Sequence, residues 1–174
     1  MTFAQNNAHP TDRALKVLDV RADDVVVDFG CGSGHYTISL AKKAKRVIGI
    51  DLQAGKLERA AKYAKRNNVV VEFYQSDGKS IPLNDAIADL IFLRRVYHEL
   101  DDKHVVLKEL VRLMKSVGRI AIMEKTKGLT PIGPPRVDIS SIVNSMGNVG
   151  LEVSERIEMG NETIVIGKRT KTTG

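Results

Sequence analysis

The chain has 174 residues, of which 43% are hydrophobic and 28% charged, and its formal net charge is +6. This length and balance predict a single folded domain with a sizeable core, spanning residues 1–174. The one cysteine, Cys31, excludes an intrachain disulfide and a cysteine-based zinc site, and it fits a cytoplasmic protein. We expect no membrane span, because no run of about 18 apolar residues occurs, and no secretory signal, because the N-terminus has no apolar stretch.

The positive charge could indicate an RNA partner, an anionic metabolite or no specific partner. The basic residues do not cluster in the sequence. Several fall on the expected outer face of one helix, including Lys56, Arg59 and Lys62. We therefore interpret most of them as solvated surface residues.

Strand-like and helix-like segments alternate along the chain. In chain order, the expected elements are helix 12–20, strand 25–29, helix 33–45, strand 46–50, helix 53–67, strand 69–74, strand 89–93, helix 102–115, strand 118–123, helix 138–149, strand 151–158 and strand 162–168. We expect Thr11 to cap the first helix and Asp101 or Asp102 to cap the fourth. Residues 1–11 are expected to be flexible or to form a short lid.

Five strand–helix units followed by a hairpin predict an α/β fold. Its doubly wound, mostly parallel seven-stranded sheet would have helices on both faces and a C-terminal antiparallel hairpin. Such sheets bind ligands beyond the carboxyl ends of their strands. Functional residues should therefore come directly after strands.

The segment 25–34, VVVDFGCGSG, leads a buried strand into alternating glycines and then into a helix. Gly30, Gly32 and Gly34 allow a tight turn and a close backbone approach to a ligand. A dinucleotide fingerprint, G-x-G-x-x-G, would need glycine where His35 stands, so a nicotinamide oxidoreductase is disfavoured.

Polar residues follow the next strands in the same way. Asp51 ends the second strand, where a carboxylate can accept hydrogen bonds from both hydroxyls of a ribose. Leu52 would offer an apolar face to an adenine. Asp77 and Gly78 follow the third strand and could meet an adenine edge, although Asp-Gly is also a common turn.

With these motifs, VVVDFGCGSGHYT, VIGIDLQ, QSDG, ADLIFLRRVYHELDD and LMKSVGRIAIME, the chain resembles class I methyltransferases that use S-adenosylmethionine (SAM). It is most similar to the type 11 branch, which includes ubiquinone- and menaquinone-biosynthesis enzymes. The resemblance covers residues 12–168 and implies SAM as cofactor and S-adenosylhomocysteine (SAH) as product. It implies these cofactor-binding residues: Asp28, Gly30, Cys31, Gly32, Gly34, Tyr36, Asp51, Leu52, Asp77, Gly78 and Arg94.

The resemblance places Asp28, the glycine loop and Tyr36 around the methionine part of SAM. The backbone carbonyl of Arg94 would meet the methionine amino group. Many relatives have a small polar residue at that position, so the pair Arg94 and Arg95 is a departure that points to an anionic acceptor.

Methyl transfer depends mainly on positioning, and a general base is optional. His98 is the candidate base, followed by Tyr97 and Glu124; His98 could instead pack or cap beside the loop. We expect no metal site. A cytosine C5 mechanism, which needs a cysteine nucleophile, is excluded, because Cys31 sits in the cofactor loop.

We expect a small-molecule acceptor. RNA or protein acceptors, a non-catalytic SAM-binding subunit and a homo-oligomer that completes the site stay open as alternatives. The proline-rich loop 130–136 is the other segment that we expect to cover the acceptor. Arg136 could hold an acid group there, although we favour a plain surface arginine.

Overall fold

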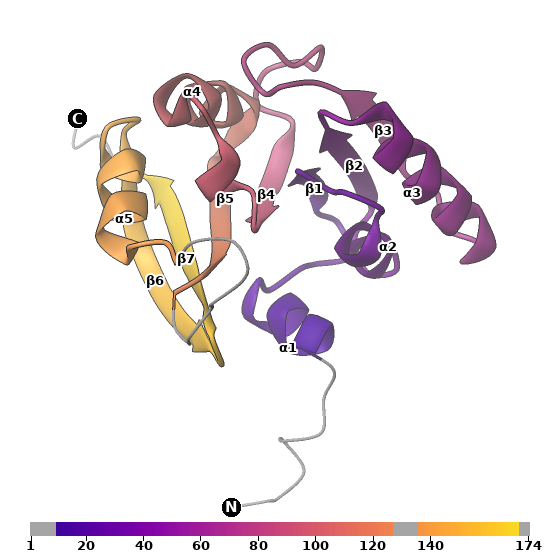
Figure 1. The fold of residues 1–174 in the computed structure, drawn as a ribbon, viewed down its shortest axis with the longest axis horizontal. Coiled ribbons are helices and arrows are strands. Elements are labelled where there is room, and N and C mark those ends of the chain that lie inside the picture. The colour runs from indigo at the N-terminus through magenta and orange to yellow at the C-terminus, as the bar shows by residue number, and fades with distance from the viewer. Residues whose placement is uncertain (1–9, 127–135, 171–174) are drawn as a thin grey trace, which may run out of the picture.

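The computed structural model describes residues 10–126 and 136–170 (Figure 1). One seven-stranded sheet forms its centre, in the order β3-β2-β1-β4-β5-β7-β6. The strands are β1 (Val25–Phe29), β2 (Arg46–Asp51), β3 (Glu72–Gln75), β4 (Ala88–Arg94), β5 (Met114–Lys125), β6 (Leu151–Met159) and β7 (Glu162–Arg169). The first five strands pair in parallel, and β7 runs antiparallel to both β5 and β6. The predicted sheet and its C-terminal hairpin are therefore confirmed.

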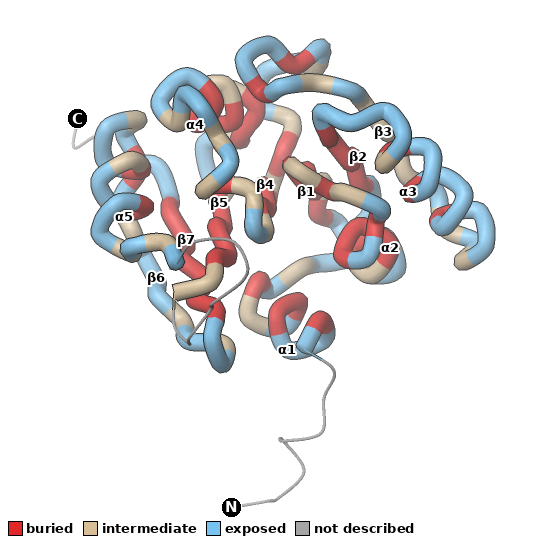
Figure 2. The backbone as a smooth tube through the Cα atoms, viewed as in Figure 1, coloured by how far each residue is buried: buried red, intermediate tan, exposed pale blue. Residues whose placement is uncertain are grey.

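Helices cover both faces of this sheet. They are α1 (Pro10–Val17), α2 (His35–Ala41), α3 (Ala54–Arg66), α4 (Lys103–Leu113) and α5 (Ile139–Gly147), with a short 3-10 helix, η2 (Tyr97–Glu99), after β4. Figure 1 shows α1, α2 and α3 on one face and α4 and α5 on the other. Because both faces are covered, the central strands are buried along almost their whole length (Figure 2).

Each face has its own apolar core. Side chains alternate along β4, so Leu90 and Phe92 pack with α1 and α2, while Ile91 and Leu93 pack with α4. The same alternation decides on which face of the sheet the side chains at the end of β4 lie.

Several sequence expectations about element boundaries are wrong. Helix α2 ends at Ala41 rather than at Lys45, and Met114 and Lys115 begin β5 rather than end the fourth helix. Helix α1 begins at Pro10, a residue suited to the first turn, so Thr11 lies inside the helix, buried, and does not cap it. Strand β3 begins only at Glu72. The Val69 amide donates to the Ala64 carbonyl (3.2 Å) and closes the end of α3, which takes residues 69–71 out of the strand.

The remaining lid and loop expectations lie mostly outside the described residues. Of residues 1–11, only Pro10 and Thr11 are described, and they belong to α1. Of the loop 130–136, only Arg136 is described, and it is exposed. Over 10–126 and 136–170, no helix has the length and apolar character needed to cross a membrane.

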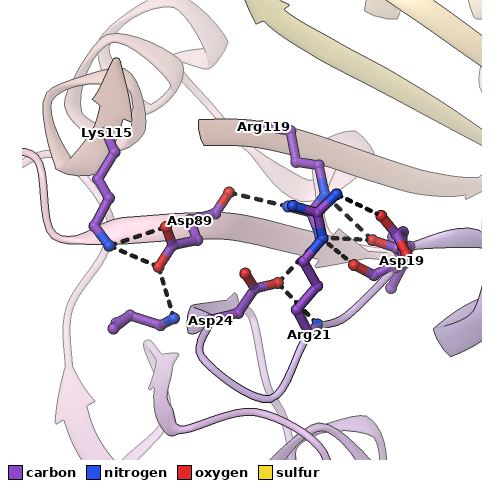
Figure 3. A network of polar contacts seen from close by, with 8 residues as sticks. Asp19, Arg21, Asp24, Asp89, Lys115 and Arg119 are labelled. Carbon is purple, nitrogen blue, oxygen red and sulfur yellow. Dashed lines mark hydrogen bonds and ion pairs between the residues drawn. The ribbon is translucent and has the colours of Figure 1, made fainter. Parts of the chain in front are cut away.

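A polar network ties the chain together at the amino ends of the strands (Figure 3). Arg119 on β5 donates to the carbonyls of Leu18 and Asp19 (both 2.8 Å) and to the Asp24 carboxylate (3.2 Å). Nearby, Asp89 accepts from Lys115 and from the Val25 amide, both at 2.8 Å. Burial would raise the pKa of Asp89, but these hydrogen bonds outweigh it and hold the pKa below its ordinary value. This network fixes the amino ends of the strands. The carboxyl ends, on the opposite side of the sheet, are therefore left for a ligand.

Candidate active site

The loop after β1 is anchored to β2. The amides of Gly30 and Cys31 both donate to the Ile50 carbonyl, at 2.7 and 2.9 Å. Gly30 has φ 75°, and a Cβ there would lie 2.0 Å from a methyl carbon of Val96. A side chain at Gly32, which has φ 56°, would meet no atom within 4 Å. The loop is thus packed closely at Gly30 and open at Gly32, where its backbone borders a cleft.

The carboxylate of Asp51 is held in a fixed position at the end of β2. One oxygen accepts from the Gly32 amide and the other from the Gln53 amide, each at 2.9 Å. Asp51 is buried, whereas its neighbour Leu52 is 62% exposed. The carboxylate keeps lone pairs beyond these two bonds, so it can accept further hydrogen bonds from a ligand.

Two adjoining hollows lie at the carboxyl ends of the parallel strands. The larger has a volume of about 450 Å³, within the usual range for small-molecule sites. It is lined by Phe29, Gly30, Gly32, Asp51, Leu52, Gln53, Lys56, Ser76, Asp77, Lys79, Arg94, Arg95, Val96, Glu99, Leu100, Asp101, Asp102 and Val106. The smaller, about 140 Å³, is lined by Asp28, Gly30, Cys31, Ser33, His35, Tyr36 and Arg94. Gly30 and Arg94 border both.

Asp28 is a buried acid beneath the smaller hollow. The Thr37 hydroxyl donates to its carboxylate at 2.6 Å. Burial raises the pKa of Asp28 to about 6; the nearby Asp51 charge adds to the rise, while the Thr37 hydrogen bond and the Arg94 charge oppose it. A cationic group in the smaller hollow would stabilise the ionised form of Asp28.

Two consecutive arginines meet at one carboxylate beyond β4. Arg94 and Arg95 each donate to a different oxygen of the buried Glu162, at 3.0 and 2.7 Å. The Arg94 guanidinium also lies 4.8 Å from the centre of the Tyr36 ring. Sequence reasoning missed Glu162, because it begins β7, 67 residues or more from either arginine.

His98 and Glu124 form a second pair, on the side of α4 and α5. The His98 Nδ1 lies 3.0 Å from the carboxylate of Glu124, which is completely buried. With the Nδ1 proton directed at Glu124, the lone pair is on Nε2. Tyr97, the next candidate base, directs its hydroxyl to Ser141 and Ser145 on α5 and is buried, so it faces away from the cleft.

Most of the predicted site residues come together. Nine of them line one hollow or both: Asp28, Gly30, Cys31, Gly32, Tyr36, Asp51, Leu52, Asp77 and Arg94. Gly34 packs against Ala60, and Gly78 packs against Phe29 and Val106. Those two glycines and His98 lie outside the lining of both hollows, as far as the described residues go. The cleft also gains Lys56 and Lys79, which lie in no quoted motif, and residues 99–102, which end the motif ADLIFLRRVYHELDD but had no predicted role in binding.

A family model described as a methyltransferase domain matches residues 27–122, more than half of the chain. The chain belongs to this methyltransferase family. The match runs from β1 to β5 and so includes the glycine loop, Asp51 and the arginine pair.

The chain is 32% identical over 123 residues to demethylmenaquinone methyltransferase of Lactobacillus johnsonii, covering 68% of this chain and 50% of that protein. It is 30% identical over 124 residues to 27-O-demethylrifamycin SV methyltransferase of Amycolatopsis mediterranei, covering 70% and 46%. The chain thus spans about half the length of these relatives.

The fold is similar to that of a SAM-dependent methyltransferase from Aquifex aeolicus. The TM-score is 0.83 at 26% identity, covering 90% of this chain and 88% of that one. Family and fold imply SAM as the cofactor. The residues present suit it: Gly32 leaves the cleft open where a Cβ would project, and Asp51 offers a fixed acceptor of hydrogen bonds from hydroxyl groups.

Proposed function

We propose that this chain transfers a methyl group from SAM to a small-molecule acceptor and releases SAH. The observation that carries the proposal is the Asp51 carboxylate, which two backbone amides fix against the glycine loop at the wall of a cleft of about 450 Å³. Family membership and two small-molecule methyltransferases among the relatives support it.

The cofactor supplies a methyl group activated on a sulfonium. The protein therefore acts mainly by binding and orientation. Asp51 would hold the ribose hydroxyls, Leu52 and Asp77 would contact the adenine, and Asp28 would face the methionine amino group. The glycine loop brings its backbone close to this ligand without side chains in the way.

His98 stays our candidate general base where the acceptor must lose a proton; it lines neither hollow itself, and its neighbour Glu99 lines the larger one. Glu124 orients its ring through Nδ1 and leaves Nε2 to accept. We expect His98→Gln to lower kcat by about a hundredfold, the lower end for general-base catalysis, and to leave the KM for SAM unchanged. An unchanged kcat would remove His98 from the mechanism.

An RNA acceptor is the second candidate, because a 23S rRNA (uracil(1939)-C(5))-methyltransferase from Alcanivorax borkumensis is 30% identical over 123 residues. Those residues cover 69% of this chain but 26% of that protein. A C5 reaction needs a cysteine nucleophile. Cys31 is buried, and burial raises the pKa of its thiol far above the ordinary value, so it is unsuited to that role.

We also propose that the chain forms a single domain and that the protein is cytoplasmic. Whether it forms a homo-oligomer would be tested by measuring its mass in solution.

Radiolabelled methyl transfer from SAM into fractionated cell extract tests the proposal. The wild-type protein should label the small-molecule fraction, and Asp51→Ala should not at the same SAM concentration. Asp23→Ala, an exposed acid before β1, is the matched control and should behave as wild type. Label in the RNA or protein fraction would show that the acceptor is a macromolecule and not a small molecule. SAM binding without label in any fraction would instead favour a non-catalytic SAM-binding subunit.

A further inference from the structure

Arg94 and Arg95 reach the same carboxylate only because the chain turns between them. Successive side chains of a strand point to opposite faces of a sheet. Arg95, however, has φ 54°, the left-handed region that residues with a side chain rarely adopt. This turn directs the Arg95 guanidinium back to Glu162, where Arg94 already binds. The backbone is thus strained at the point where the two cations are brought together.

One carboxylate does not neutralise this cluster. Lys125 lies directly opposite Glu162 in the β5–β7 ladder, and residues paired in this way share a face of the sheet. The two guanidiniums that bind Glu162 therefore outnumber its single charge, and Lys125 is a third cationic residue on the same face of the sheet. Asp28 lines the smaller hollow, and Asp51, Asp77, Glu99, Asp101 and Asp102 line the larger one. Among the described residues, the ion pairs of Arg94 and Arg95 are with Glu162 and not with these acids.

The contacts that Arg94 makes within the fold do not explain why an arginine stands at this position. Its Nε is buried without a hydrogen-bond partner among the described residues. A buried N–H that lacks an acceptor costs free energy, so a purely structural position would favour a residue without it. Arg94 nevertheless lines both hollows, and Arg95, whose side chain is 43% exposed, lines the larger one.

We propose that Arg94 and Arg95 bind an oxyanion of the methyl acceptor, a carboxylate or a phosphate, so that the substrate is a small anionic molecule. This inference rests on the proposed methyl transfer. Glu162 holds the two guanidiniums in place, and their remaining N–H groups form the fork geometry that suits a planar or tetrahedral oxyanion.

Anion-exchange fractionation of the acceptor tests the inference. The small-molecule ultrafiltrate of an extract from cells that make this protein is separated into retained and unretained pools. Each pool is assayed with radiolabelled SAM. We expect the acceptor in the retained pool, and we expect it to be lost after phosphatase treatment if the group is a phosphate, or after carbodiimide coupling to an amine if it is a carboxylate. Acceptor activity in the unretained pool, or only in RNA or protein, overturns the inference and leaves methyl transfer standing. No label from any pool contradicts the proposed function itself.

Variants then assign the anion to the arginines. Arg95→Gln should raise the KM for the retained acceptor at least tenfold and leave the KM for SAM and the thermal midpoint near wild type; Arg95→Lys should restore part of the loss. Arg21→Gln removes the same charge from the opposite edge, where Arg21 pairs with the exposed Asp19, and should change neither KM. An acceptor KM that stays at the wild-type value in both Arg94→Gln and Arg95→Gln overturns the inference. So does a loss confined to SAM binding, which would place the arginines at the cofactor.

Discussion

Asp28 is a buried charge that costs stability, and Asn at this position should remove that cost. Burial raises the pKa of Asp28 from 3.8 to about 6, and the residue is only 3% exposed. At 1.36 kcal/mol for each pKa unit, the difference corresponds to about 3 kcal/mol. Asn keeps the shape of the side chain and an oxygen that can accept from the Thr37 hydroxyl, now 2.6 Å from the carboxylate.

The sign of this effect depends on pH. The folded protein holds a proton on Asp28 up to a higher pH than the unfolded chain does. The favourable contribution is therefore fully present below pH 3.8 and is lost as the pH rises through about 6. Asp28→Asn has no such dependence, so we expect it to match the wild type near pH 4 and to exceed its free energy of unfolding by about 3 kcal/mol at pH 7.5.

Urea unfolding at several pH values measures the difference. Asp24→Asn is the matched control, because Asp24 is equally buried but accepts hydrogen bonds from Arg119 and the Arg21 amide. It should destabilise the protein at pH 7.5. If Asp28→Asn also lowers the free energy of unfolding at pH 7.5, the burial argument is refuted. The same variant should bind SAM more weakly, because its smaller hollow would lack the charge that faces the methionine amino group.

Four other substitutions test the site and the frame around it. Asp51→Ala should weaken SAH binding about a hundredfold in calorimetry, since two hydrogen bonds to a charged group are worth about 3 kcal/mol; an affinity equal to wild type would show that the ribose lies elsewhere. Arg119→Met leaves Asp24 buried without its cation, so urea unfolding should show a loss of about 3 kcal/mol, and a loss below about 1 kcal/mol would mean that water replaces the pair. Gly30→Ala should cost more than 3 kcal/mol in the same assay, because its Cβ would overlap Val96, whereas Gly32→Ala should cost about 1–2 kcal/mol for its backbone alone. Equal losses for the two glycines would contradict the packing at Gly30.

The local pattern of the sequence was enough to predict the architecture. The run Val25–Phe29 is a strand with the predicted bounds, because β-branched residues before a glycine turn have one favourable arrangement in a parallel sheet. Asp102 caps α4 by accepting from the Val105 amide, as its position before an amphipathic segment indicates. The boundaries that failed, such as that of β3, depend on competition for a few backbone hydrogen bonds.

Most of the site residues predicted from the sequence also line the two hollows, because they follow strands at the spacing that parallel β–α units impose. Asp51 and Gly32 are 19 residues apart, yet they must meet where β1 and β2 end side by side. The sequence named Arg94, Arg95, His98 and Glu124 as candidates, but it did not show which side chains they would contact. Glu162 comes from a strand that inserts between β5 and β6, and Glu124 meets His98 only through the pairing of β4 with β5. Such contacts have no local signal. The left-handed turn at Arg95, which brings two cations to one carboxylate, is decided by the tertiary structure alone, because the packing around it must offset the strain.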